Sequence, residues 1–189
     1  MQIPATQRLT FRLLDAQDAE LLFRLDQDPA VMQYINGGVP SSMQDIVQRM
    51  LPRMQAYRDP AKGYGIYAVF AREAMTLNNG QPLAAGDYLG WVLVRPMNFF
   101  TTGAEPDDLE LGWRFFRHCW RQGIASEAAA AVAAVLTAQP GIRKLSAISL
   151  PDNHGSVAVM KKLGMSYVKR YMHRDPLGDY DVVLYSKTV

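Results

Sequence analysis

Hydrophobic and polar positions at the start of the chain follow first a strand period and then a helix period. Residues 8–14 alternate, which predicts a strand ending at Asp15. Three leucines between positions 21 and 25 then recur at helical spacing. Asp15 and Asp18 stand where a helix N-terminus favours negative charge. The pattern therefore predicts a strand followed by a capped helix.

Two further helices are expected before residue 60. Asp28 can cap the first, with a proline in its opening turn and Gly37 beyond its end. The second begins at Ser41 or Ser42 and continues with apolar residues at helical spacing. Pro52 must kink or divide this helix, because proline lacks the backbone N–H that a helix interior uses.

The middle of the chain is rich in β-branched and aromatic residues. Tracts typical of strands are "GYGIYAVFARE" from residue 63, "DYLGWVLVRP" from residue 87 and "LELGWRFF" from residue 109. "NNG", after the first tract, is a strong turn signal. Three strands in succession predict an antiparallel meander.

The second half alternates helices and strands. An alanine-rich helix is expected from Gly123 to Leu136, followed by the strand "KLSAISL", the short helix "SVAVMKKLG" and the strands "MSYVKRYM" and "YDVVLYSKT". This order indicates a mixed α/β fold. The strand-to-helix turns near Gly123 and Ser156 should face the same direction, where ligands usually bind.

Composition narrows the class of protein. The 189 residues, with no linker or repeat, predict a single domain over 1–189. The net charge of +2 comes from scattered lysines and arginines, which gives no indication of a nucleic-acid partner. Cys119 is the single cysteine, so a reducing cytoplasm is the simplest location. We expect no signal peptide and no membrane association, because the apolar runs are too short.

Gly123 is the first candidate for chemistry. A glycine between strand and helix lets the backbone approach a ligand, and the free N–H groups of the helix can bind a phosphate. The simpler alternative is that Gly123 only eases a turn. P-loop, dinucleotide and serine-hydrolase motifs are absent from the sequence, which argues against those three classes.

Four ordered blocks decide between these alternatives: "RLTFRLLDAQDAELLFRL" with "DPAVMQYI", "LELGWRFFRHCWRQGIASEA", "DNHGSVAVMKKLGM" and "YDVVLYS". They resemble the GNAT acetyltransferases, and within that family the branch similar to the N-terminal acetyltransferases of ribosomal proteins. The resemblance implies an α/β (α+β) GNAT fold, with a mixed, mostly antiparallel sheet of about seven strands flanked by helices. It also implies acetyl-CoA as cosubstrate and no metal.

The resemblance assigns the cosubstrate to two segments. The turn and helix start would bind the pyrophosphate through backbone N–H groups, with Arg121 either helping or remaining a solvated surface residue. The preceding strand would pair with the pantetheine arm. Asn153 would hydrogen-bond that arm, and Ser156 would lie near the sulfur. The implied cofactor-binding residues are Gly112, Trp113, Arg114, Phe115, Arg121, Gln122, Gly123, Ile124, Ala125, Ser126, Asn153 and Ser156.

Two residues are candidates for catalysis. Amine acetylation needs a proton acceptor for the amine and a proton for the departing thiolate. Glu110 is the best placed carboxylate, although a water relay or a purely solvent-facing role is the alternative. Many GNAT enzymes carry a tyrosine as general acid where this chain has Met160, so we expect Ser156, or a water that it holds, to take that role.

The acceptor is the least defined part of the reaction. We expect a primary amine, most simply a protein N-terminus, with Tyr34 and Asn36 as wall residues of its site. A polyamine, an antibiotic or an amino-acid-like amine remains an alternative, as does a non-catalytic acyl-CoA sensor on the same fold. The protein is expected to be a monomer or homodimer.

Overall fold

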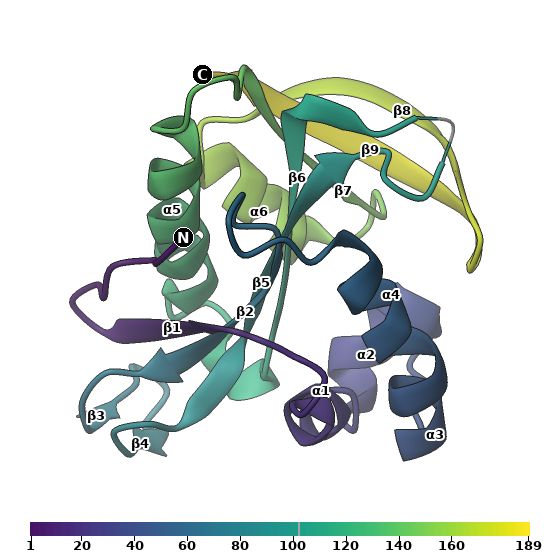
Figure 1. Cartoon of the computed structure of the whole chain (residues 1–189). Coiled ribbons are helices and arrows are strands. Elements are labelled where there is room, and N and C mark those ends of the chain that lie inside the picture. Colours follow the sequence, from purple (N-terminus) through teal and green to yellow (C-terminus); the bar gives the residue numbers. More distant parts are fainter. Residues whose placement is uncertain (102) are drawn as a thin grey trace.

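A seven-stranded sheet with the order β1-β2-β5-β6-β7-β9-β8 runs through the molecule (Figure 1). The structure is a computed structural model that describes residues 1–101 and 103–189. The strands are β1 (Leu9–Leu13), β2 (Gly65–Ala71), β5 (Tyr88–Met97), β6 (Glu105–Phe115), β7 (Lys144–Ser149), β8 (Ser166–Asp175) and β9 (Gly178–Thr188). Neighbours are antiparallel except β6 and β7, which are parallel. The mixed, mostly antiparallel sheet and the meander β2-β5-β6 are thereby confirmed.

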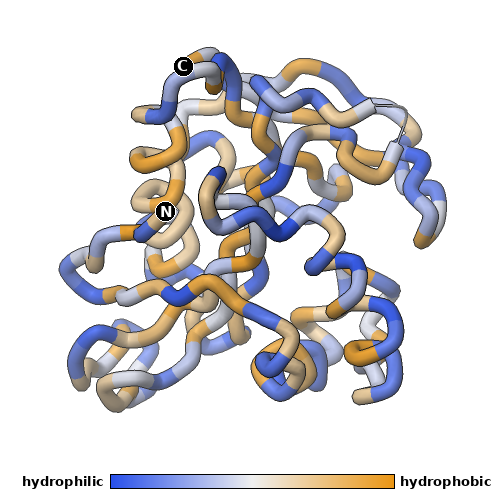
Figure 2. Tube along the Cα trace, viewed as in Figure 1, coloured by the Kyte–Doolittle hydropathy of each residue, from blue (hydrophilic) through white to orange (hydrophobic). Residues whose placement is uncertain are grey.

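Helices cover both faces of this sheet (Figure 1). One face carries α1 (Ala19–Leu25), α2 (Pro29–Asn36), α3 (Met43–Asp45), the π-helical turn η1 (Ile46–Met50) and α4 (Leu51–Tyr57), and the other carries η2 (Arg117–Cys119), α5 (Ile124–Thr137) and α6 (His154–Lys162). Each face has its own apolar core. Figure 2 shows hydrophobic residues gathered along α5 and the central strands, where the layers meet. Within the described ranges, no helix is long and apolar enough to cross a membrane.

The predicted helix signals have a physical counterpart in the structure. The Asp28 side chain accepts a hydrogen bond from the Ala30 N–H at 2.8 Å, and Gly37 ends α2 with φ of 81°. Pro52 divides the next helix as predicted, because the π-helical turn directly before it widens the backbone where a proline ring would otherwise clash.

Some boundaries differ from the prediction. "NNG" does not join the long strands but forms the tip of a separate small hairpin of β3 (Met75–Thr76) and β4 (Pro82–Leu83). The sixth strand begins at Glu105, earlier than the apolar tract indicates. The last helix begins at His154, because Asn153 rather than Ser156 caps it.

The central strands β6 and β7 stay paired over a short stretch only. Asp108–Glu110 of β6 lies beside Lys144–Ser146 of β7. Beyond that point β6 continues to pair with β5, and β7 continues to pair with β9. The sheet therefore divides into two arms towards the carboxyl ends of its parallel strands, which is where ligands bind in many α/β sheets.

Candidate active site

The divided edge of the sheet brings two sequence motifs together. The chain leaves β6 and enters α5 at Gly123, and it leaves β7 and enters α6 at Asn153. Because β6 and β7 are parallel, both helix starts lie at the same edge. The predicted common direction of these two turns is thus confirmed.

The turn before α5 leaves a helix N-terminus available to an anion. Gly123 has φ of 77° and Arg121 has φ of 60°, so the chain twice enters the left-handed region in three residues. Within the described part of the chain, no side chain caps α5 at Gly123. The backbone N–H groups of residues 124–126 therefore form the kind of positive end that binds phosphate.

Arg8 holds this turn from outside. Its Nη1 donates to the Gln122 carbonyl oxygen at 3.1 Å, and its Nε donates to Glu127 Oε2 at 2.7 Å. Thr6 donates to the other oxygen of Glu127. The Gln122 side-chain oxygen accepts from the Asn78 N–H at 2.9 Å. Both oxygens of Gln122 are thus occupied, which leaves its backbone N–H and its side-chain amide nitrogen as groups that a ligand could use.

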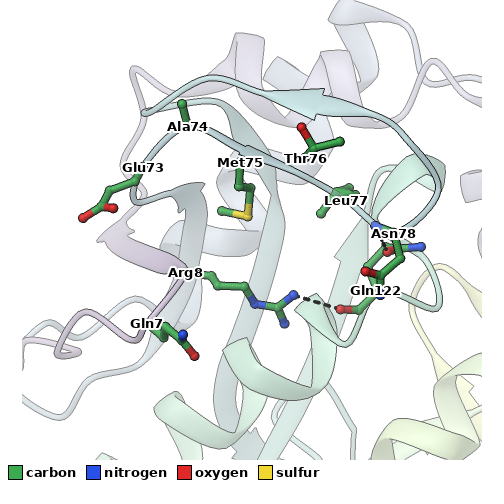
Figure 3. Close-up of a pocket in the computed structure, with 9 residues that line it drawn as sticks. All are labelled: Gln7, Arg8, Glu73, Ala74, Met75, Thr76, Leu77, Asn78 and Gln122. Carbon is green, nitrogen blue, oxygen red and sulfur yellow. Dashed lines mark hydrogen bonds between the residues drawn. The ribbon is translucent and has the colours of Figure 1, made fainter.

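A surface pocket of about 300 Å³ lies beside the turn, between Arg8, Gln122 and the β3 segment (Figure 3). Figure 3 shows the Arg8 guanidinium reaching along the pocket floor to Gln122. No local sequence pattern indicates this contact between Arg8 and Gln122, because more than a hundred residues separate them along the chain.

The side chains of β6 divide between the two faces of the sheet. Trp113 and Phe115 pack into the core beneath α5. Arg114 points to the other face, where its Nη1 donates to Asp26 at the end of α1. Arg114 was expected to help bind the cofactor. Since its side chain is committed to this buried ion pair, its backbone is the part left for a pantetheine arm.

Glu110 lies on the same face as Arg114 and is buried. Arg95, its neighbour on β5, donates from Nε to Oε2 at 2.7 Å and from Nη2 to Oε1 at 2.9 Å. Burial works against the Arg95 charge, but the Glu110 carboxylate outweighs it, so the pKa of Arg95 is raised above its ordinary value. Glu110 is therefore buried and held in place by two hydrogen bonds from Arg95, rather than facing solvent.

Asn153 and Ser156 meet at the start of α6. The Asn153 side-chain oxygen accepts from the Ser156 N–H at 3.1 Å, which leaves the amide nitrogen and the serine hydroxyl for other partners. Met160, at the usual tyrosine position, is fully buried in the core beneath the sheet. It has neither the exposure nor the chemistry to deliver a proton.

A second cleft of about 280 Å³ lies between α1–α4, the central strands and the β8–β9 hairpin, and we name it the acceptor cleft for the role proposed for it below. Tyr34 lines this cleft, and its role as a wall residue of the acceptor site stays a prediction. Asn36 is not among the residues around the cleft. It instead donates to the Val39 carbonyl at 2.8 Å and accepts from the Val39 N–H at 3.1 Å, which fixes the loop after α2.

Several charged residues of this cleft could not be recognised from the sequence. Arg95 and Arg114 belong to apolar strand tracts, and Asp26 follows an unremarkable helix. Arg53 on α4 binds Asp175 at the tip of the β8–β9 hairpin, which joins two segments far apart in the chain. Their functional placement depends on tertiary pairing, for which a single sequence carries no local signal.

Cys119 was interpreted as a packing residue, and its environment agrees with that role. It is buried, and burial raises the pKa of its thiol to about 12. A thiolate nucleophile is therefore not available at neutral pH. Across residues 1–101 and 103–189, no group of three His, Cys, Asp or Glu side chains is arranged to hold a metal ion.

Comparison with known proteins agrees with this geometry. The family described as "Acetyltransferase (GNAT) domain" matches residues 8–166. FsC-acetyl coenzyme A-N(2)-transacetylase of Aspergillus fumigatus is 25% identical over 174 residues, which cover 89% of this chain and 67% of that protein. Both relatives that follow are solved structures with coenzyme A bound, and their identity to this chain is low enough to show the fold alone.

The first of these structures is RimL, a ribosomal L7/L12 alpha-N-protein acetyltransferase. It has a TM-score of 0.72 and 17% identity, covering 100% of this chain and 98% of that one. The second is aminoglycoside acetyltransferase AAC(6')-Ib, with a TM-score of 0.68 and 16% identity over 95% of this chain and 94% of that one. Since the family match extends from β1 to the end of α6 and includes the turn before α5, the chain belongs to the GNAT acetyltransferase family and is an acetyl-CoA-dependent N-acetyltransferase.

Proposed function

We propose that the protein acetylates the N-terminal amine of a peptide or protein. The observation that carries this choice is the surplus of N–H donors in the acceptor cleft. Arg53, Arg95 and Arg114 line it. Each is paired with one carboxylate, Asp175, Glu110 and Asp26 in that order, and each guanidinium has more N–H donors than that pairing uses. A peptide brings carbonyl oxygens to such a cleft and a single cation, whereas a polyamine or an aminoglycoside brings several cations.

Unpartnered polar groups support the same choice. Arg114 Nε and Trp91 Nε1 are buried and have no hydrogen-bond partner among the described residues. Both residues line the cleft. Unpaired buried donors are costly, so an oxygen-rich ligand or the waters that accompany it would be stabilised there.

For acetyl-CoA, we propose that the pyrophosphate binds the backbone of residues 121–126, with Gly123 at the point of closest approach. The second left-handed residue at Arg121 supports this, because such backbone strain persists where the surroundings require it. Arg121 can add a charge-assisted hydrogen bond to phosphate. The pantetheine arm would extend along the unpaired edge of β6 towards Asn153.

The chemistry then requires several proton transfers. The amine nitrogen forms a bond to the thioester carbonyl carbon, the carbon–sulfur bond breaks, and the sulfur leaves as a thiolate. Before the attack, Glu110, directly or through a water, takes one proton from the ammonium group, so that the amine attacks in its neutral form. Ser156, or a water that its hydroxyl holds, then supplies a proton to the departing thiolate and is re-protonated by the surplus proton of the acylated nitrogen.

A thiol-release assay tests the proposal. Coenzyme A release from acetyl-CoA is measured with peptides that have a free N-terminus, with the same peptides blocked at the N-terminus, and with a polyamine and an aminoglycoside. We expect release with the free peptides and none with the blocked ones. The proposal would be contradicted if coenzyme A were released with the polyamine or the aminoglycoside but not with any of the peptides.

A further inference from the structure

Arg53 combines unused hydrogen-bond donors with access to the acceptor cleft. Arg95 donates two hydrogen bonds to one carboxylate, that of Glu110, and Arg114 is more deeply buried than Arg53. Arg53 donates one hydrogen bond, from Nη2 to Asp175. Among the described residues its Nε and Nη1 have no partner, and neither atom is fully buried. Its side chain lines the cleft and is 15% exposed.

The Arg53 guanidinium is also held in a fixed place. Its Cζ lies 3.6 Å from the centre of the Phe100 ring, which provides a cation–π contact. Asp175 holds its other side and is itself fixed, because the Leu177 N–H donates to Asp175 Oδ1 at 2.9 Å. A ligand that binds Arg53 therefore loses little side-chain entropy.

Asp175 already has partners around it. Besides Arg53, Nε2 of His173 lies 4.0 Å from Asp175 Oδ2, and the charge of Asp175 also acts on Arg95. An ammonium group would have to displace these partners to bind Asp175. A carboxylate, in contrast, can use the remaining N–H groups of Arg53 without breaking the existing pair.

We propose that Arg53 is a specificity-determining residue that binds a carboxylate carried by the acceptor close to its reacting amine. Asp175 positions the guanidinium for this contact. The inference rests on the proposed function only for the choice of peptides as acceptors. It predicts a preference for N-termini followed by an aspartate or glutamate over those followed by a lysine.

The test compares peptides that differ only at their second and third residues, which are acidic, neutral or basic. The quantity measured is the ratio of kcat/KM for the acidic peptide to that for the neutral one. For the unmodified protein we expect the ratio to be about two- to fivefold, the range for a partly exposed charge pair. Raising the salt concentration should reduce it.

Variants separate binding by Arg53 from a structural role. Arg53→Gln should bring the ratio close to one. Asp175→Asn should keep or increase it, because the amide oxygen can still position the guanidinium while the negative charge that opposes an acceptor carboxylate is removed. Arg53→Lys, which keeps the charge, should keep part of it. Arg49→Gln is the matched control, because Arg49 lies one helical turn earlier and is 55% exposed. Its guanidinium pairs with Asp45 at a distance of 3.2 Å, and it is not among the residues that line the cleft. Arg49→Gln should leave the ratio unchanged.

An unchanged ratio in Arg53→Gln, with acetyl-CoA affinity and melting temperature near those of the unmodified protein, would overturn the inference. An equal decrease of the ratio in Arg53→Gln and Asp175→Asn would also overturn it, since the two residues would then act only as an ion pair that stabilises the structure. If no peptide is acetylated, the proposed function fails. The quantity then measured is the ratio of kcat/KM for a free amino acid to that for its C-terminal amide. A carboxylate preference that Arg53→Gln removes would then still support the inference, and its absence would overturn it.

Discussion

Arg95 and Glu110 face each other on neighbouring strands and share two hydrogen bonds of 2.7 Å and 2.9 Å. The pair lies where the sheet begins to divide, and Arg95 also lines the acceptor cleft. The two hydrogen bonds from Arg95 fix the direction of the Glu110 carboxylate, so in the proposed mechanism it receives a proton from the ammonium group, directly or through a water, without first changing its conformation.

Glu110→Gln should therefore lower the acceptor-dependent kcat by about 100-fold, the usual contribution of a general base. The loss should be largest at low pH, where more of the acceptor amine is protonated and needs a proton acceptor. Acetyl-CoA affinity should change little. The measurement is kcat against pH with a saturating peptide.

Glu105→Gln is the control for this variant. Glu105 lies on the same strand but is exposed at its start, where Asn98 Nδ2 donates to it at 2.6 Å. A pH profile of Glu110→Gln that matches those of the control and the unmodified protein would remove Glu110 from the mechanism.

Gly123→Val should weaken the binding of coenzyme A at least about tenfold, because a left-handed β-branched residue costs about 1–2 kcal/mol and would shift the turn. Gly141→Val is the matched control: Gly141 has φ of 90° and lies beyond the other end of α5. Calorimetric titration measures both. Equal affinity in the two folded variants would overturn the pyrophosphate assignment.

The Arg8–Glu127 contact predicts a pH dependence of stability. Burial raises the pKa of Glu127, but hydrogen bonds from Thr6 and Arg8 lower it by more, so its pKa lies below the ordinary value. A lowered pKa contributes stability above the ordinary carboxyl pKa, and this contribution is lost as the pH falls through the folded-state value.

Glu127→Gln should accordingly lower the free energy of unfolding at pH 7 by about 1–2 kcal/mol, the contribution of hydrogen bonds to a charged group. The difference should shrink as the pH falls from the ordinary carboxyl pKa to below the lowered folded-state pKa of Glu127, where both side chains are uncharged. Urea unfolding at several pH values measures it. A difference independent of pH would show that Glu127 acts through packing alone.

Cys119 should resist alkylation in the folded protein, because a thiol with a pKa of about 12 is almost wholly protonated and Cys119 is buried. We expect iodoacetamide at pH 8 to label it after unfolding and not before, and Cys119→Ala to retain acetyl transfer. Rapid labelling of the native protein with loss of activity would contradict this interpretation.

The sequence predicts elements where one local cause decides the structure. Asp28 and Gly37 delimit α2 because a capping carboxylate and a left-handed glycine act within a few residues. Pro52 likewise divides its helix through its own missing N–H. Helix starts with two polar residues close together are less certain: the helix predicted to begin at Ser156 begins at His154, because the Asn153 side chain caps it.

Charged side chains of the site could not be placed in the same way. Glu110 could be proposed from the family resemblance, but its pairing with Arg95 depends on the register between β5 and β6. Arg53 and Asp175 meet only after α4 and the β8–β9 hairpin have packed around the cleft. The sequence therefore indicates the donor site well and the acceptor site poorly, since the first is a local motif and the second is assembled from distant segments.

Locating the transferred acetyl group tests the central claim most directly. The protein is incubated with acetyl-CoA, a polyamine and a peptide that has a free N-terminus and an internal lysine, and tandem mass spectrometry then locates the acetyl group on each product. We predict acetylation of the peptide α-amine, with the lysine and the polyamine unmodified. Acetyl groups on the polyamine or the lysine side chain, and none on the α-amine, would contradict the account.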